Sequence, residues 1–262
     1  MKIDFLQFDF SYLITLISGG ACWQGVKFIY PDIKNYFEKR RKAKQILYAS
    51  MDLAIKSSDE LFGKLESLSR EDFASFINKD NSISDSPEHN QIYVYYLIGQ
   101  FWATLENIRI QSNYTSIARL KKGRELIRFI ETIESRKFRL LDRSKQRIIG
   151  EAMIINSGDK FQVMPLYFFF EKIKSDETFR NWIREIDIQF QLSKKTNIRQ
   201  RILVYGVIVA MFLDHFDSEN KISRRRDIYL IKLRPESIQL IKNILLKHYL
   251  SFIKNPKRYY TK

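Results

Sequence analysis

The stretch ILVYGVIVAMFL, residues 202–213, decides the fold because it holds 12 consecutive uncharged residues. A helix of this length is too short to cross a bilayer, which takes about 20 residues. Its β-branched residues would also suit a strand, but the length of the run and the arginine-rich residues before it favour a helix. We therefore predict that residues 202–213 form a helix in the core of the protein.

The segments that flank this run have the spacing of amphipathic helices. Before it, Pro165 suits the first turn of one helix, and apolar residues recur at helical intervals between positions 179 and 190. After it, DHFD at residues 214–217 is expected to cap the central helix, and Pro235 begins a last helix that ends near residues 255–256. The apolar face before the run consists of Phe179, Trp182, Ile183, Ile186 and Phe190.

Four more helices are predicted toward the amino terminus. They cover residues 33–69, 91–112, 115–135 and a segment that Asp142 or Ser144 caps and that ends near residue 155. The polar residues 78–90 read as a loop between the first two. Nine glycines and five prolines are few for 262 residues, which disfavours turn-rich β architecture. The chain therefore predicts an all-α fold, a multi-helix bundle with an N-terminal hydrophobic helix.

That N-terminal segment is a candidate transmembrane helix. Residues 10–26 are 17 consecutive uncharged residues, about 26 Å of helix at ~1.5 Å per residue, just short of the ~30 Å hydrocarbon core. Most nearby cations follow this segment, so the positive-inside rule places the amino terminus outside. We expect residues 1–30 to be a single-pass anchor in a bacterial inner membrane and residues 31–262 to be a basic α-helical cytoplasmic domain.

Two alternatives to the membrane span stay open. Cys22 in SGGAC would be the modified residue of a lipoprotein signal, but Asp4 and Asp9 do not fit the charge pattern of such signals. Residues 5–28 would otherwise form an amphipathic helix that docks on the bundle of a soluble, cytoplasmic protein.

A net charge of +15 calls for an acidic partner. We expect the anionic inner leaflet of the membrane to be that partner, with a protein partner or a second copy of the chain beside it, and nucleic acid as the second choice. Two cationic clusters are the candidate contacts to the membrane surface or to phosphate. They are Lys39, Arg40, Arg41, Lys42 and Lys44, and Arg224, Arg225 and Arg226.

A polar set on the predicted helices is the candidate ligand site. Arg147 and Glu151 stand four residues apart and are expected to pair, while Glu106 lies on an aromatic-rich helix and is a candidate partner for Arg147 or Arg139. Gly150 would let another helix approach closely. Glu106, Arg139, Gln146, Arg147 and Glu151 therefore form either a pocket for a charged ligand or a satisfied structural network.

The chain lacks the motifs of nucleotide-binding loops, dinucleotide folds, serine hydrolases and zinc proteases. Its single cysteine gives no Cys-based zinc site, and its three histidines lie far apart. We therefore expect no metal, no cofactor and no enzymatic activity, although an enzyme of unrecognised type stays an alternative.

YYLIGQFWATLE at residues 95–106 and FRLLDRSKQRIIGEAM at residues 138–153 follow the N-terminal hydrophobic segment. This arrangement resembles a set of uncharacterised bacterial proteins with an N-terminal anchor and a helical cytoplasmic body. The resemblance implies a membrane-associated bacterial protein, of a kind sometimes found in stress or phage-defence loci, and it implies no activity. Its matching positions are Phe101, Trp102, Phe138, Arg139, Leu140, Gln146, Arg147, Gly150, Glu151 and Met153.

These observations favour a membrane-anchored protein that acts by binding, as a scaffold, sensor or effector. A soluble basic protein that binds nucleic acid is the alternative.

Overall fold

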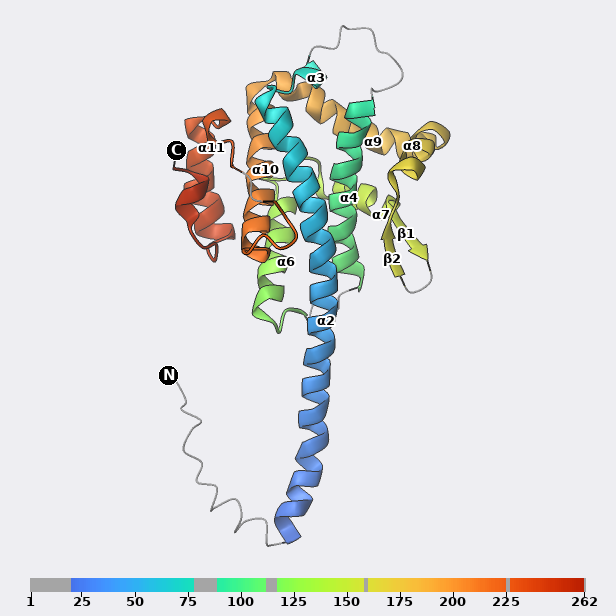
Figure 1. The fold of residues 1–262 in the computed structure, drawn as a ribbon, viewed down its shortest axis with the longest axis vertical. Helices are drawn as coiled ribbons and strands as arrows, with labels where there is room; N and C mark the ends of the chain where they lie inside the picture. Colours follow the sequence, from blue (N-terminus) through green and yellow to red (C-terminus); the bar gives the residue numbers. More distant parts are fainter. Residues whose placement is uncertain (1–19, 78–88, 112–116, 158–159, 225–226, 262) are drawn as a thin grey trace. The chain divides into compact units, whose positions relative to one another are not determined.

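The computed structural model describes residues 20–77, 89–111, 117–157, 160–224 and 227–261, which are mostly helical, so the predicted all-α class is confirmed (Figure 1). The α-helices are α2 (Gly20–Arg70), α3 (Ala74–Ile77), α4 (His89–Gln111), α6 (Lys121–Glu134), α7 (Arg143–Ala152), α8 (Leu166–Ser175), α9 (Glu177–Gln191), α10 (Thr196–Phe216) and α11 (Pro235–Leu240). The other elements in these ranges are the strands β1 (Ile154–Ser157) and β2 (Lys160–Val163), the 3₁₀ turns η1 (Leu192–Lys194), η2 (Leu230–Lys232) and η4 (Pro256–Tyr259), and the π-helix η3 (Ile241–Tyr249).

The chain divides into two compact units, Met1–Gln45 and Ile46–Lys262, and the boundary falls within α2. The predicted anchor lies largely in residues 1–19, outside the described residues, so the expected division at residue 30 stays a prediction. Helix α2 begins before the predicted residue 33 and contains Pro31.

Helix α10 confirms the prediction made from residues 202–213. Every residue of this run is buried, and α10 packs against α6, α11 and η1. Among the described residues, α10 is the helix that is long and apolar enough to cross a membrane, but 72% of its most apolar window is buried inside the protein. We therefore interpret α10 as the central helix of the body, where its β-branched side chains are covered on all sides.

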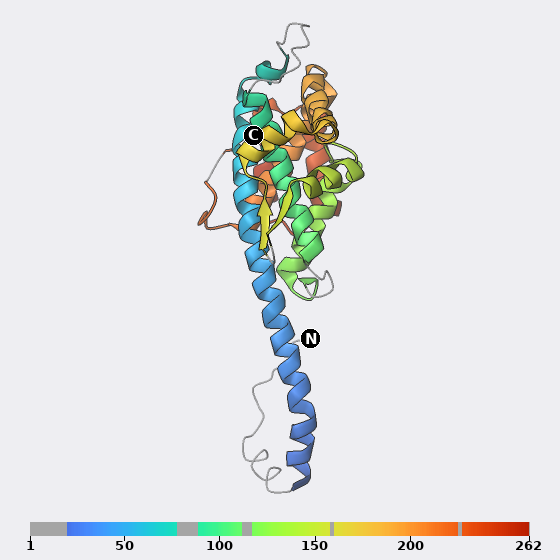
Figure 2. The same cartoon turned by 90° about the vertical axis from the view of Figure 1, so that its right-hand side faces the viewer.

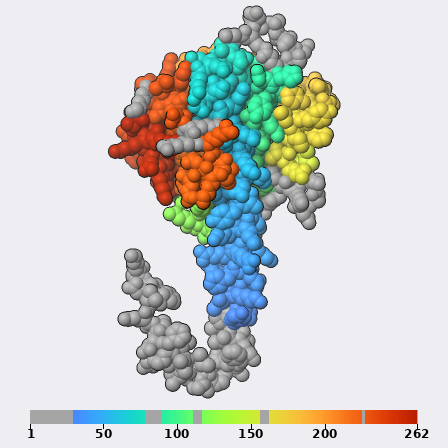
Figure 3. Space-filling model, in the orientation of Figure 1, coloured from blue at the N-terminus to red at the C-terminus, as the bar shows by residue number. Residues whose placement is uncertain are grey.

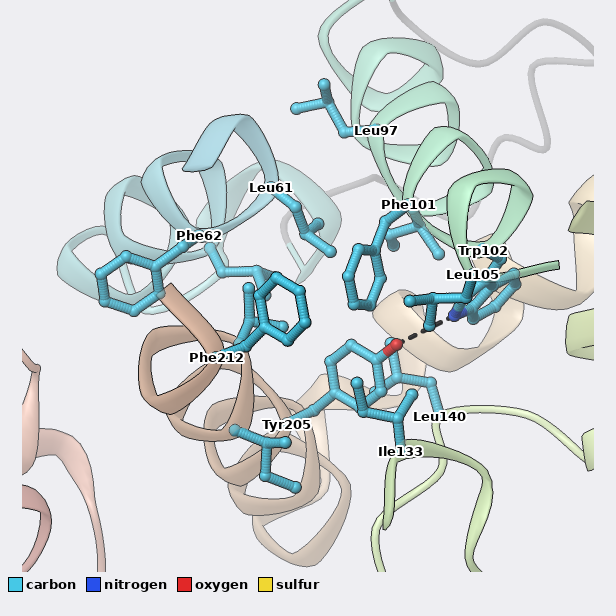
Figure 4. Close-up of a cluster of buried hydrophobic side chains, with 14 of the residues drawn as sticks. Leu61, Phe62, Leu97, Phe101, Trp102, Leu105, Ile133, Leu140, Tyr205 and Phe212 are labelled. Carbon is cyan, nitrogen blue, oxygen red and sulfur yellow. Dashed lines mark hydrogen bonds between the residues drawn. The ribbon is translucent and has the colours of Figure 1, made fainter. Parts of the chain in front are cut away.

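Side chains from α2, α4 and α6 meet those of α10 in the core (Figure 4). The indole Nε1–H of Trp102 donates to the hydroxyl oxygen of Tyr205 at 2.9 Å, so the polar atoms of two large aromatic residues satisfy each other inside the core. The other labelled members of this cluster are Leu61 and Phe62 of α2, Leu97, Phe101 and Leu105 of α4, Ile133 of α6, Leu140, and Phe212 of α10.

Helices α4 and α7 pack closely because each has a glycine at the contact. A Cβ on Gly150 of α7 would stand 2.9 Å from the carbonyl oxygen of Trp102, and a Cβ on Gly99 of α4 would stand 2.1 Å from the Sδ of Met153. The predicted role of Gly150, close approach of a second helix, is confirmed.

A two-stranded hairpin was not predicted. The helix expected to reach residue 155 ends at Ala152, and Ile154 begins β1, which pairs antiparallel with β2 in the register Ile154↔Val163. The prediction was wrong at this end because the β-branched pair Ile154–Ile155 suits an extended backbone. The hairpin lies beside α4 (Figure 2).

Other predicted helix ends also shift. The helix expected over residues 115–135 is α6, which begins at Lys121. The last helix is α11 followed by η3, which ends at Tyr249 rather than near residue 255, because Leu250 leaves the helical conformation. Most of the predicted loop 78–90 lies outside the described residues, and α4 already begins at His89.

DHFD ends α10 as expected, because the backbone N–H of Asp217 donates to the carbonyl of Leu213, but the side chain of Asp217 orders the turn that follows the helix. Its carboxylate accepts the backbone N–H groups of Lys221, Ile222 and Ser223 at 2.7–3.0 Å. Nearby, Asp214 Oδ2 accepts the hydroxyl of Tyr259 at 2.6 Å, which ties the end of α10 to η4.

Candidate functional site

The first candidate site is the segment of α2 between residues 30 and 44. Tyr30, Ile33 and Phe37 are 62%, 48% and 60% exposed, and their i, i+3, i+7 spacing places them on one face of the helix. The five predicted cations follow along the same helix, and all are exposed. They are Lys39, Arg40, Arg41, Lys42 and Lys44. This segment belongs to the darkest blue part of the chain in Figure 3. An exposed apolar band, Tyr30, Ile33 and Phe37, is thus followed by an exposed cationic band.

The second predicted cationic cluster is only partly described. Arg224 is exposed, and its backbone N–H donates to Asp59 Oδ1 at 3.3 Å. Arg225 and Arg226 lie outside the described residues.

The predicted polar set is only partly brought together, around a carboxylate that the sequence analysis did not single out. Glu134 stands at the end of α6, and its side chain is 7% exposed. One oxygen accepts from Arg109 of α4, and the other accepts from Arg143 Nε at 2.8 Å and Arg147 Nη2 at 3.1 Å. The second guanidinium nitrogen of Arg109 donates to Glu106. We call Glu106, Arg109, Glu134, Arg143 and Arg147 the ion cluster.

The other predicted members lie outside the ion cluster. Arg139 donates to Asp142 instead. The side-chain oxygen of Gln146 accepts the backbone N–H of Leu141 at 3.2 Å, which closes the turn before α7. The predicted Arg147–Glu151 pair does not form, because Arg147 turns to Glu134 while Glu151 is exposed.

The two carboxylates of the ion cluster have opposite pKa shifts. Burial raises the pKa of Glu134, but the hydrogen bonds and charges of Arg147 and Arg109 outweigh it, so that the pKa is below its ordinary value. Burial also raises the pKa of Glu106, and here the charges of Arg109 and Arg147 do not compensate for it. Glu134 is therefore the anion that holds the cluster together.

Sequence reasoning missed Arg109, Glu134 and Arg143. Glu106 and Arg109 stand three residues apart on one helix, and this spacing was a signal for Arg109. No sequence signal indicated Glu134, because an acidic residue at the end of an amphipathic helix is usually a surface residue. Because both oxygens of Glu134 are fully bonded, we interpret the ion cluster as a clamp that fastens α4, α6 and α7 together.

Metal ligands do not gather in the described part of the chain, where no three His, Cys, Asp or Glu side chains are close enough to hold an ion. His215 Nε2 lies 3.0 Å from Glu125 Oε2 and packs against the rings of Phe129, Phe216 and Phe252. This pair joins α10 to α6 and is surrounded by aromatic rings.

In comparisons with known proteins, no family model, no curated protein and no solved structure matches the chain.

Proposed function

We propose that the protein is a membrane-anchored helical binding protein. In this proposal, residues 1–30 contain a single transmembrane helix with its amino terminus outside. Residues 30–44 of α2 then meet the cytoplasmic face of the membrane, and the helical unit from Ile46 onward binds partners in the cytoplasm.

The observation that supports the proposal is the order of exposed side chains along α2. Tyr30, Ile33 and Phe37 are apolar side chains left in solvent, where burial at a membrane interface would stabilise them. Lys39 and the next four cations follow on the same helix and are exposed, so in this proposal they contact the anionic headgroups. Aromatic residues at the interface with cations just beyond them are typical of the cytoplasmic end of a membrane anchor.

The estimated attraction of the five cations to the membrane favours an anchor that combines a hydrophobic segment with the cationic band. Each cation near an anionic surface contributes about 1 kcal/mol, so five contribute about 5 kcal/mol. Electrostatic attraction of this size is reversible and salt-sensitive. It supplements a hydrophobic segment that Ser11, Thr15 and Gln24 make only weakly apolar.

Membrane fractionation of the full-length protein tests the proposal. Membranes are washed with high salt and then with alkaline carbonate, beside a variant that lacks residues 2–28. We expect the full-length protein to survive both washes and the truncated protein to be released. A full-length protein found wholly in the soluble fraction contradicts the anchor, and salt-sensitive binding to nucleic acid would then be the next function to test.

A second experiment isolates the cationic band. All five cations from Lys39 to Lys44 are replaced with glutamine, which keeps helix propensity, and co-sedimentation with phosphatidylglycerol vesicles is measured. We expect binding to fall strongly in this variant and to change little in a control with the same loss of charge. The control replaces five exposed lysines of the second unit, namely Lys194, Lys195, Lys247, Lys254 and Lys257. Equal losses in both would show that only total charge matters.

A further inference from the structure

A polar hollow of about 270 Å³ lies beside the connection between α6 and α7, within the unit Ile46–Lys262. Four cationic side chains line it: Arg136 and Arg139 of the connection, Lys145 of α7 and Arg201 of α10. The acidic residues in its lining are Asp142 and Glu185, which leaves an excess of two positive charges.

Both carboxylates of the hollow are already bonded. Asp142 accepts from Arg139, and Glu185 Oε1 accepts from Lys145 Nζ at 2.7 Å. Among the residues that the structure describes, neither Arg136 nor Arg201 has a carboxylate within 4.0 Å. The excess charge therefore lies on these two guanidinium groups.

Arg201 is the member whose hydrogen bonding is least complete. Its Nη2 donates to the backbone carbonyl of Arg136 at 3.4 Å, while its Nε is buried and finds no acceptor in the described part of the chain. Burial and the charge of Arg139 lower the pKa of Arg201. An arginine nevertheless keeps its proton in a protein, so the unmet N–H and the positive charge both remain and both suit an anion.

A second hollow, of about 580 Å³, shares Arg136 and Arg201 with the first. Its wall contains the apolar side chains of Phe138, Val204 and Leu240. Thr196 and Ser237, at the first turns of α10 and α11, add hydroxyl groups. Lys137, Arg234 and Glu236 also line this second hollow, so it is cationic as well. The two guanidinium groups therefore stand between a small polar hollow and a larger cationic hollow that has an apolar wall.

We propose that these adjoining hollows bind a phosphorylated small molecule, whose phosphate is held by Arg136 and Arg201 and whose uncharged body lies against Phe138, Val204 and Leu240. An excess of two positive charges matches the dianion of a phosphate monoester better than a single carboxylate. The planar guanidinium group donates in pairs to phosphate oxygens, which is why arginine is the residue of choice for such sites. This inference goes beyond the proposed membrane anchor and does not depend on it.

Two sources share this chemistry, a soluble nucleotide and the phosphate headgroup of a lipid. The test is isothermal titration calorimetry on the full-length protein in phosphate-free buffer, in detergent where it fractionates with membranes. AMP, pyrophosphate and glycerol 3-phosphate are titrated separately. AMP and glycerol 3-phosphate are both phosphate monoesters, so tighter binding of AMP indicates the nucleotide source and the reverse order indicates the headgroup source. A pyrophosphate affinity equal to that of the best organic ligand would overturn the role of the apolar wall.

Variants that each remove one positive charge distinguish a specific binding site from general electrostatic attraction to the protein. Arg201→Gln and Arg136→Gln should each weaken binding at least tenfold, whereas Arg184→Gln, on the exposed surface of α9, should change it less than twofold. Because the side chain of Arg136 is exposed, its variant keeps the test valid even if Arg201→Gln unfolds. Equal weakening in all three variants, or no binding of any of the three ligands, would overturn the proposal.

Discussion

Gly150 of α7 lies against the backbone of Trp102 in α4, so close that a Cβ on Gly150 would stand 2.9 Å from the Trp102 carbonyl oxygen and 3.0 Å from its carbonyl carbon. The obstacle is main chain within a helix, which cannot rotate away as a side chain can. The contact between α4 and α7 therefore depends on the absence of one methyl group.

Gly150→Ala is expected to destabilise the protein by about 1–3 kcal/mol, the usual cost of overpacking. In an exposed helix the same change would stabilise by about 1 kcal/mol, because alanine has the higher helix propensity. The sign of the effect therefore reports the steric contact. The midpoint of urea unfolding, with an unchanged dependence on urea, is the measurement.

Gly99→Ala is the matched comparison for Gly150→Ala. The obstacle there is the thioether of Met153, which is the flexible end of a side chain and can adopt another rotamer. We expect a smaller loss of stability than for Gly150→Ala. If Gly99→Ala is the more harmful change, rigid backbone contact is not what limits the approach of the two helices.

Glu134→Gln is expected to cost about 3 kcal/mol of folding stability. The change leaves three guanidinium groups without their shared carboxylate, and breaking a buried pair costs about 3–5 kcal/mol. The lower figure applies because the side chains of Arg143 and Arg147 are 55% and 32% exposed and can turn to water. Arg147→Ala should cost only about 1 kcal/mol, because Glu134 keeps two other donors. Similar losses in the two variants would mean that Glu134 is not the centre of the ion cluster.

The contribution of Glu134 should depend on pH. Its pKa is lower in the folded than in the unfolded protein, so its stabilising effect is fully present above the unfolded value and is lost as the pH falls through the folded value. The difference in stability between wild type and Glu134→Gln should therefore be largest near neutral pH and should shrink below about pH 4.3. Unfolding midpoints measured from pH 3 to pH 7 check this, and a constant difference across the range contradicts it.

Glu106 should act in the opposite direction. Its pKa is raised in the folded protein, so the folded state binds the proton more tightly, and ionisation of Glu106 lowers stability as the pH rises through that raised value. Comparison of Glu106→Gln with wild type should show the relative stability of the wild type falling as the pH rises above the ordinary glutamate range. A relative stability that rises instead would assign Glu106 the anchoring role given to Glu134.

The central helix could be predicted from sequence because its signal is local. Twelve uncharged residues in succession have few places in a compact helical unit other than its interior, and residues 202–213 are all buried. Gly150 was also informative, since a glycine inside a helix is costly unless a close contact requires it. Strand β1 has four residues, too few to show the alternating pattern of a strand, so the sequence predicted its start as the end of the preceding helix.

The ion cluster could not be predicted in full because its bonds join separate helices. Arg109 and Glu134 are 25 residues apart and Glu134 and Arg147 are 13 apart, distances at which sequence spacing carries no information on contact. Local reasoning instead paired Arg147 with Glu151 on the same helix. The buried carboxylate of Glu134 could attract Arg147 more strongly, because charges interact more strongly away from water.

The hydrogen bond between Trp102 and Tyr205 gives the last prediction. Tyr205→Phe removes the acceptor of a buried indole N–H, and an unsatisfied buried donor costs about 1–3 kcal/mol. Tyr229→Phe is the matched control, because its hydroxyl donates at 3.1 Å to the carbonyl of Leu203, an oxygen inside α10 that the helix itself also bonds. We expect Tyr205→Phe to lower the unfolding midpoint more than Tyr229→Phe does. Equal effects would indicate that the loss of stability comes from removing a tyrosine hydroxyl and not from leaving the indole N–H of Trp102 without an acceptor.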